Sequence, residues 1–322
     1  MSGGALHSPI GVMLMSFGSV TTPEEVPDYL SRVRGGRPMP EAVVVEMQRR
    51  YSAIGGSPLV RITREQASAL ETLLNDDAGK ASAYRVTVGM RYAPPYVGDT
   101  LSELAAAGIN QVVGIIMAPQ HSPIILGGYH QAMADARGAL AEDLDVRIAG
   151  AWHTLPSFLG ALASRVEVAL DGYPSAERDG VQLLMTAHSL PKQVVDREPE
   201  YLDMLRGTAE AVAQRVGLAD DRWRFAYQSA GHSPEEWLKP DIAELFPLLA
   251  ESGCKDVLVV PVQFLADHLE LLYDIDIAAR EQAEEAGLKL RRIEAFNVMP
   301  EFIRALADVV HRELDLAGWP SA

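Results

Sequence analysis

A histidine and three carboxylates are grouped in the stretch VLVVPVQFLADHLELLYDIDI, which covers residues 257–277. They are His268, Glu270, Asp274 and Asp276. Imidazole and carboxylate groups together suit a divalent transition metal, and they also transfer protons. Glu270 and Asp274 are four residues apart, so in a helix the two carboxylates would lie on one face. The stretch therefore predicts a metal site or a proton-transfer site.

A purely structural interpretation of the same stretch competes with this one. Asp267 could cap a helix N-terminus while Glu270 reaches back to the cap, and acidic residues stabilise the start of a helix in any case. On this stretch alone we favour capping over chemistry, so other segments of the chain have to decide.

Two further histidines lie in patterns that look nearly the same. His188 belongs to TAHSLP, residues 186–191, and His153 belongs to WHTLP, residues 152–156. A proline soon after the histidine keeps a helix from starting early, so the side chain stays at the end of a strand. A histidine in that position is as often structural as functional, and the residue types leave the choice between His153 and His188 open.

Arginines are concentrated between residues 32 and 64. This segment holds seven arginines and only two glutamates, a net charge of +5 in a chain whose formal charge is −16. Arginine is the preferred partner of carboxylate and phosphate groups. The local reversal of sign therefore predicts an anionic ligand.

Apolar runs that alternate with helical patterns must position these residues. The runs predicted to be strands cover residues 10–17, 84–88, 111–117, 146–150, 181–186, 224–227, 257–260 and 288–293. Strands that alternate with helices form parallel sheets in an α/β fold. We predict two Rossmann-like domains, residues 1–150 and 151–322, each with a four-stranded parallel sheet flanked by helices. We expect the last helix, about residues 299–316, to pack on the N-terminal domain.

Polar and glycine-rich clusters follow six of the predicted strands. In such folds ligands bind beyond the carboxyl ends of the strands, so the clusters predict an active-site cleft between the two domains. The chain contains neither GxxxxGK[ST] nor a GxGxxG pattern after its first strand. The sequence therefore gives no support to nucleotide binding.

Composition excludes several other classes of protein. The net charge of −16 argues against binding to nucleic acid or to an anionic membrane surface, and no apolar run reaches membrane-spanning length. Cys254 is the single cysteine, which excludes an intrachain disulfide and a four-cysteine iron–sulfur cluster. The first residues carry no basic region ahead of an apolar one, so we expect a soluble, cytoplasmic protein.

The ordered set of motifs resembles the ferrochelatases, enzymes that insert ferrous iron into a porphyrin. The motifs are LMSFG (14–18), YSAIGGSPL (51–59), TAHSLP (186–191), YQSAG (227–231), WLKP (237–240) and PVQFLADHLE (261–270). Each motif is weak alone, but all occur in the family's order. The sequence is most similar to the coproporphyrin ferrochelatases of bacteria, which are soluble.

The resemblance implies roles for individual residues at the porphyrin centre. His188 and Glu270 match the family's catalytic residues, so His188 is favoured over His153 and Glu270 becomes a site residue instead of a cap. We expect His188, Glu270 and Asp274 to bind the incoming iron. Metal insertion removes two pyrrole protons while Fe²⁺ sheds water, and a neutral imidazole can accept a proton or bind the metal.

The resemblance also implies a substrate side. Arg34 and Arg50 match positions that face porphyrin propionates, with Ser57 and Tyr129 as hydrogen-bonding candidates. We add Arg91 as a further partner and Phe17 as a wall under the ring. The expected substrates are Fe²⁺ and coproporphyrin III, which carries four propionates. We expect no other cofactor and no iron–sulfur cluster, and transient contact with other enzymes of haem synthesis.

Three positions depart from the family pattern. Phe17 stands where similar enzymes often have a tyrosine that ligates iron, and Arg91-Tyr92 stands where the family has a Lys-His pair. In the family, carboxylates often continue one helical turn beyond Asp274 and form the outer part of the iron path. This chain has Ala278 at that position, and Asp276 or Glu281 could supply the carboxylate instead.

Other functions stay open alongside coproporphyrin ferrochelatase. The first alternative keeps the enzyme class with protoporphyrin IX or another metal and tetrapyrrole. The second is a porphyrin or haem carrier without turnover, which would not need the pair formed by His188 and Glu270. A third, a periplasmic-type small-molecule binder, is disfavoured because we see no export signal.

Overall fold

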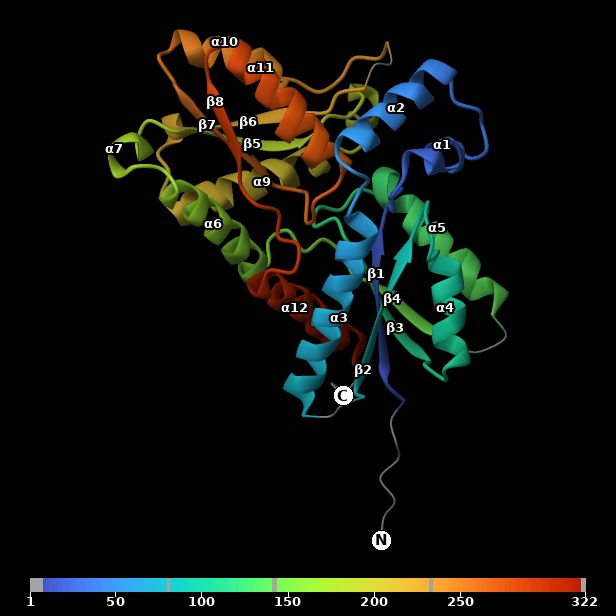
Figure 1. The fold of residues 1–322 in the computed structure, drawn as a ribbon. Helices are drawn as coiled ribbons and strands as arrows, with labels where there is room; N and C mark the ends of the chain where they lie inside the picture. Colours follow the sequence, from blue (N-terminus) through green and yellow to red (C-terminus); the bar gives the residue numbers. More distant parts are fainter. Residues whose placement is uncertain (1–7, 80–81, 141–143, 232–233, 320–322) are drawn as a thin grey trace.

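A computed structural model describes residues 8–79, 82–140, 144–231 and 234–319, and it contains two parallel sheets with helices on their faces (Figure 1). The prediction of two four-stranded parallel sheets is confirmed. The strands of the first sheet are β1 (Ile10–Ser16), β2 (Tyr84–Met90), β3 (Gln111–Ile116) and β4 (Asp145–Ile148). The strands of the second sheet are β5 (Gln182–His188), β6 (Trp223–Gln228), β7 (Asp256–Pro261) and β8 (Lys289–Arg292).

The two sheets share one topology. Their strand orders are β2-β1-β3-β4 and β6-β5-β7-β8, and every pairing is parallel. The inner strands come from the most continuous apolar runs, such as VLVV in β7, because helices cover both faces of a parallel sheet. Burial on both faces therefore explains why these strands are readable as unbroken apolar segments.

Helices connect the strands. In the first half they are η1 (Pro23–Glu25), α1 (Val26–Val33), α2 (Glu41–Ala53), α3 (Leu59–Ala78), α4 (Val97–Ala106) and α5 (Pro123–Ala139). In the second half they are α6 (Pro156–Asp171), α7 (Ser175–Arg178), α8 (Lys192–Val195), α9 (Pro199–Val216), η2 (Asp220–Arg222), α10 (Ile242–Glu251), η3 (Glu270–Ala279), α11 (Arg280–Glu285) and α12 (Pro300–Ala317).

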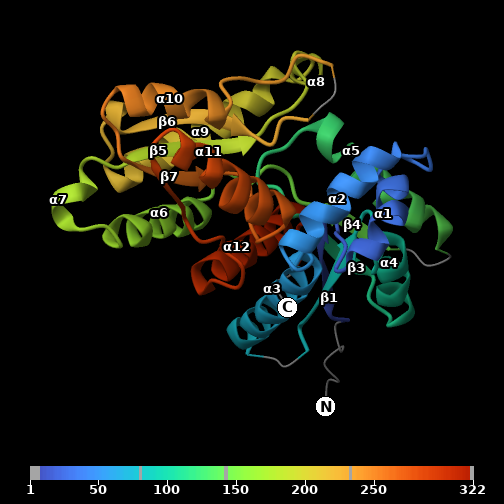
Figure 2. The same cartoon turned by 45° about the horizontal axis from the view of Figure 1, so that its top comes forward.

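The last helix, α12, connects the two halves. It contacts α6 of the second half as well as α3 and β3 of the first, and both views place it between α3 and α6 (Figure 2). Its Phe302 is fully buried in a cluster that also contains Leu14 of β1 and Leu183 of β5. One hydrophobic core therefore extends under both sheets. The domain boundary near residue 150 stays a prediction.

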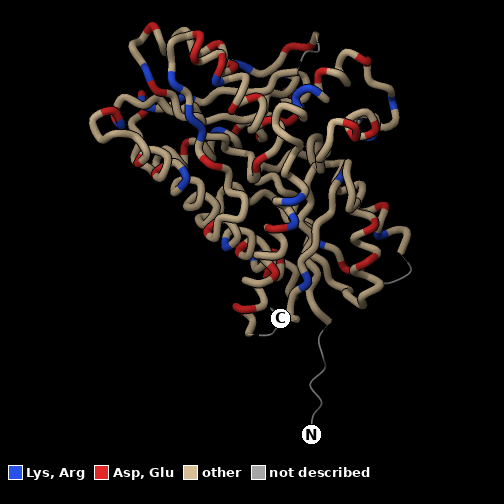
Figure 3. Tube along the Cα trace, in the orientation of Figure 1, with Lys and Arg blue, Asp and Glu red and all other residues tan. Residues whose placement is uncertain are grey.

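Charged residues are interspersed over both halves of the molecule (Figure 3). Within the described residues, none of the helices combines the length and the apolar character needed to cross a membrane.

Candidate active site

Loops at the carboxyl ends of the strands meet in the middle of the molecule. In the second sheet, the amide of Ser189 donates to the carbonyl of Gln228 (2.7 Å), and the amide of His188 donates to Oε1 of Gln263 (3.3 Å). The two halves are joined here because Nε2 of Gln120 donates to the carbonyl of Val262 (3.3 Å). Hydrogen bonds therefore position the loops that follow β5, β6 and β7, together with the loop after β3.

Glu270 lies between two histidines. Its Oε1 is 3.8 Å from Nε2 of His188, and its Oε2 is 3.6 Å from Nε2 of His268. All three side chains are partly buried, with exposed fractions of 26% for His188, 34% for Glu270 and 15% for His268. The structure thus brings together His188 and Glu270, which are 82 positions apart in the chain.

Backbone carbonyls determine the tautomers of both histidines. Nδ1 of His188 is hydrogen-bonded to the carbonyl of Ser189, and Nδ1 of His268 to the carbonyl of Ala266 (2.9 Å). A carbonyl only accepts, so Nδ1 carries hydrogen in each ring. The neutral rings then present the lone pair of Nε2 toward Glu270, and either Nε2 can take up a proton there.

The charges of this group are strongly coupled. Burial alone would raise the pKa of Glu270, but the attraction of His188 and the contact with His268 outweigh it and lower the pKa to about 2. Burial opposes protonation of His268, yet the hydrogen bond and charge of Glu270 raise the pKa of this histidine. Glu270 is therefore an anion at neutral pH that stabilises a positive charge on the imidazoles.

The capping interpretation of this stretch is wrong. The carboxylate of Asp267 does not cap η3, because it accepts hydrogen bonds from Nη2 of Arg292 (3.1 Å) and Nδ2 of Asn297 (2.8 Å) instead. Glu270 is the first residue of η3, and the preceding Leu269 makes no side-chain cap hydrogen bond. The carboxylate of Glu270 is therefore available to the histidines.

The helix that carries Glu270 is a π-helix. The amide of Arg280, which follows the last residue of η3, donates to the carbonyl of Ile275, five residues back. π-Helices are rare and frequently occur at functional sites. The sequence pattern predicted helix here but gave no sign of the wider turn.

Asp274 is paired with Arg50 from the opposite half of the molecule. Nη1 of Arg50 lies 3.3 Å from Oδ1 of Asp274, and Nε of Arg50 lies 2.8 Å from Oε1 of Glu46. Both Arg50 and Asp274 are largely buried, with exposed fractions of 23% and 17%. Burial raises the pKa of Asp274, and the charge of Glu270 raises it further, against the lowering effect of Arg50.

An apolar cluster surrounds this ion pair and connects α1 and α2 with η3. Tyr29 and Tyr51 pack in it with Leu269 and Tyr273. The ring of Tyr273 lies 5.0 Å from the guanidinium of Arg50, a cation–π distance. The arginine-rich segment thus faces the acidic stretch, a contact that neither segment predicts alone.

Arg91 is held by aromatic rings on the side of the first sheet. Its guanidinium lies 4.7 Å from the ring centre of Tyr92 and 5.6 Å from that of Tyr129, and Phe17 packs on Tyr92 at 4.6 Å. Gly128 makes room for it, because a Cβ there would come within 1.9 Å of the guanidinium carbon. Phe17 is 41% exposed, whereas Tyr129 is buried.

The remaining predicted residues occupy different surroundings. Arg34 directly follows α1, and its Nη1 contacts the sulfur of Met39 (3.2 Å). Ser57 is buried, and its hydroxyl accepts from the amide of Leu59 (3.4 Å). His153 lies apart from Glu270, with Nδ1 hydrogen-bonded to Thr208 (3.3 Å), and burial lowers its pKa. The structure therefore separates His153 from His188, which the residue types did not.

Sequence reasoning placed His268 in the candidate group with Glu270, but the resemblance to the family assigned it no role. No sequence pattern pointed to the buried tyrosines Tyr29 and Tyr51. Tyr51 hydrogen-bonds to Ser19 (3.0 Å), and Tyr29 donates to the carbonyl of Gly18 (3.1 Å). Burial raises the pKa of both tyrosines, so their hydroxyls stay protonated.

Asp276, considered for the outer iron path, is bound bidentately by Arg292. Glu281 on α11 is exposed. Across the described ranges, no group of three or more His, Cys, Asp and Glu side chains is arranged to hold a metal ion. His188, Glu270 and Asp274 thus form no preassembled three-ligand site, and their binding of substrate iron stays a prediction.

Comparisons with solved structures support the fold. The structure is similar to SirB from Bacillus subtilis with Fe³⁺, with a TM-score of 0.60 and 11% identity over 98% of this chain and 100% of that one. It is also similar to CbiX, described as the terminal enzyme for siroheme biosynthesis in denitrifying bacteria. The TM-score is 0.53 and the identity 16%, over 94% of this chain and 98% of that one.

Comparisons with known sequences identify the family. A ferrochelatase from Deinococcus radiodurans is 38% identical over 308 residues, which cover 95% of this chain and 96% of the relative. A coproporphyrin III ferrochelatase from Geobacillus kaustophilus is 35% identical over 302 residues, 93% of this chain and 94% of the relative. A family model described as ferrochelatase matches residues 9–314. The chain therefore belongs to the ferrochelatase family, enzymes that insert a metal into a porphyrin in haem synthesis.

Proposed function

We propose that this chain is a coproporphyrin ferrochelatase, which inserts Fe²⁺ into coproporphyrin III. The choice of porphyrin rests on the lack of carboxylate partners at Arg34 and Arg91. Within the described residues neither guanidinium has a carboxylate partner, although the chain is strongly acidic. Unpaired guanidinium groups beside the site favour a substrate with many carboxylates. Coproporphyrin offers four, and protoporphyrin offers two.

In this proposal His188 is the base at the porphyrin centre. Its neutral ring presents Nε2, because Nδ1 is hydrogen-bonded to the carbonyl of Ser189. Nε2 accepts the first of the two pyrrole protons, and the carboxylate of Glu270, 3.8 Å away, stabilises the imidazolium. This proton passes through Glu270 to Nε2 of His268, which lies 3.6 Å from that carboxylate, and His188 then accepts the second proton. Loss of both protons leaves the nitrogen lone pairs free to bind Fe²⁺.

The proposed route of the iron runs along η3. Glu270 and Asp274 are four residues apart on this helix, and both supply the oxygen ligands that a hydrated divalent cation accepts. Asp274 is paired with Arg50, which we also propose to bind a propionate. A propionate that binds Arg50 would therefore compete with Asp274 and release its carboxylate for the metal.

The test of the porphyrin preference is an anaerobic insertion assay with Fe²⁺, run in parallel on coproporphyrin III and protoporphyrin IX and followed by the change in porphyrin absorbance. Faster conversion of coproporphyrin III supports the proposal. Faster conversion of protoporphyrin IX would establish the alternative substrate. Tight porphyrin binding without turnover of either would favour the carrier or a chelatase for another metal, and repeating the assay with Co²⁺ in place of Fe²⁺ distinguishes the two.

Arg50→Ala is expected to weaken coproporphyrin binding by about tenfold or more, because a hydrogen bond to a charged group contributes about 1.5–3 kcal/mol. Asp274→Asn is expected to tighten binding, because Arg50 then loses its competing carboxylate. Porphyrin fluorescence titration measures both constants. Arg61→Ala is the matched control, since this arginine of the same basic segment is 65% exposed and paired with Glu65. Equal dissociation constants for all four proteins would remove Arg50 from the porphyrin site.

A further inference from the structure

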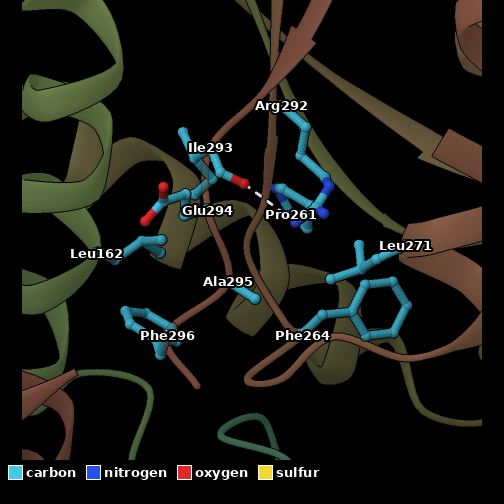
Figure 4. A pocket seen from close by; sticks show the side chains of 9 residues that line it. All are labelled: Leu162, Pro261, Phe264, Leu271, Arg292, Ile293, Glu294, Ala295 and Phe296. Carbon is cyan, nitrogen blue, oxygen red and sulfur yellow. Dashed lines mark hydrogen bonds between the residues drawn. The ribbon is translucent and has the colours of Figure 1, made fainter. Parts of the chain in front are cut away.

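A buried arginine lies behind the stretch that carries His268 and Glu270. Arg292 ends β8, and its side chain is only 9% exposed. Figure 4 shows Arg292, Leu271 and Phe264 on one side of a small cavity, with Leu162 and Phe296 on the other. The cavity is small, about 10 Å³. Mostly apolar side chains therefore pack around the guanidinium and keep it almost out of contact with solvent.

The guanidinium bridges two carboxylates. Its Nε donates to Oδ1 of Asp276 (3.0 Å), and its Nη2 donates to Oδ2 of Asp276 (2.8 Å) and to Oδ1 of Asp267 (3.1 Å). Nη1 donates to the carbonyl of Ile293 (3.1 Å), the hydrogen bond drawn in Figure 4. The planar arrangement of these donors matches carboxylate geometry in a way that a lysine ammonium does not.

Asp267 is fixed from a second side by Asn297. Nδ2 of Asn297 donates to Oδ2 of Asp267 (2.8 Å), and the amide of Asp267 donates back to Oδ1 of Asn297 (2.9 Å). Asn297 has a φ of +46°, a conformation that asparagine tolerates better than most residues. Its carbonyl accepts from Nε2 of the fully buried Gln66 on α3 (2.8 Å). The network therefore reaches from the second sheet to the first half of the chain.

The two carboxylates flank the catalytic stretch. Asp267 directly precedes His268, and Asp276 lies on η3, six residues after Glu270. One rigid guanidinium thus holds the loop before η3 and the body of η3 at a set separation. All three nitrogens of Arg292 donate to protein groups, and none of these hydrogen bonds goes to His188 or Glu270. Arg292 therefore acts on the site through Asp267 and Asp276.

We propose that Arg292 is a positioning residue, which places Glu270 between His188 and His268 by holding Asp267 and Asp276. The test by iron insertion rests on the proposed function. The claim that Arg292 places Glu270 does not rest on it. Because a shift of about 1 Å in a catalytic group can cost about 100-fold in rate, a lysine that cannot bridge both carboxylates should impair turnover.

The first test compares Arg292→Lys with the wild type in the insertion assay. We expect kcat to fall by about tenfold or more while KM for the porphyrin stays within about twofold. Arg165→Lys is the matched control, because Arg165 is also largely buried (18% exposed) and pairs with Glu294 (2.9 Å), two residues after Arg292. The control should keep its kcat. A raised KM at unchanged kcat would overturn the proposal.

A second variant, Asp276→Asn, guards against a first variant that fails to fold. A second readout, hydrogen exchange, does not depend on which porphyrin is the substrate. Asp276→Asn keeps the guanidinium in place, so it avoids the two uncompensated carboxylates that removal of Arg292 would leave. Hydrogen exchange of the folded proteins should show faster exchange over residues 268–276 in both variants, with β5 unchanged. Unchanged exchange there, or unchanged kcat in both variants, would overturn the proposal. If the wild type inserts no iron, the proposed function fails and hydrogen exchange alone decides the role of Arg292.

Discussion

Replacement of His188 by alanine is expected to abolish iron insertion and to leave porphyrin binding within about threefold of the wild type. A positioned general base contributes about 10²–10⁴-fold to rate, and His188 presents the Nε2 lone pair beside Glu270. The arginines that we assign to the propionates lie elsewhere, directly after α1, on α2 and in the loop after β2. The insertion assay gives the rate, and porphyrin fluorescence gives the dissociation constant.

His153→Ala is the matched control for this prediction. His153 lies in nearly the same sequence pattern, but it is hydrogen-bonded to Thr208 and takes no part in the group around Glu270. We expect its turnover to stay within about threefold of the wild type once the folded fraction is corrected. Near-normal turnover of His188→Ala, or a loss of turnover confined to His153→Ala, would contradict the assignment.

The sheets were predictable because burial on both faces imposes unbroken apolar runs. The run at residues 257–260 became β7, and the run at 181–186 became most of β5, each within two residues of its predicted ends. The polar clusters after these strands met as predicted because the carboxyl ends of parallel strands share an edge. The resemblance to the family then singled out His188 among similar patterns.

The contacts between distant segments were not predictable from local patterns. Arg50 and Asp274 are 224 positions apart, and nothing in either segment indicates that they form an ion pair. The spacing of Asp267 and Glu270 fits a helix cap, yet Arg292, from a different strand, takes the carboxylate of Asp267. Hydrogen bonds of this kind depend on how the chain folds back, so they became visible only with the structure.

The π-helical turn of η3 could not be predicted from the sequence pattern either. Apolar residues at 269, 271, 275 and 279 are compatible with an ordinary helix, and all are buried here. The wider turn adds a residue to each hydrogen-bonded loop, which changes the direction of every later side chain. Residues four positions apart fall on nearly the same side in the wider turn as in an ordinary one, so the prediction that Glu270 and Asp274 share a face does not depend on the helix type. The charge of Glu270 accordingly raises the pKa of Asp274.

Glu270→Gln is expected to lower kcat by about 100-fold or more. Glutamine keeps the shape of the side chain but removes the negative charge that faces Nε2 of His188 and of His268. An imidazolium formed at His188 would lose its counter-charge, and iron would lose the anionic ligand that we propose for it. Glu285→Gln is the matched control, because Glu285 is exposed on α11, the continuation of the same helix, and has no part in the proposed iron path. Equal rates for the two variants would show that Glu270 acts only in packing.

The pH dependence of stability separates this charge effect from packing. The folded-state pKa of Glu270, about 2, lies below its ordinary value of 4.5, so the ionised group stabilises the fold above pH 4.5. This contribution is lost as the pH falls through the interval from 4.5 toward 2. We therefore expect the free energy of unfolding of the wild type, relative to that of Glu270→Gln, to decrease between about pH 5 and about pH 3, as measured by urea denaturation. Glutamine has no proton to gain in this range, so a difference that stays constant would mean that Glu270 has an ordinary pKa and that its coupling to the two histidines is weak.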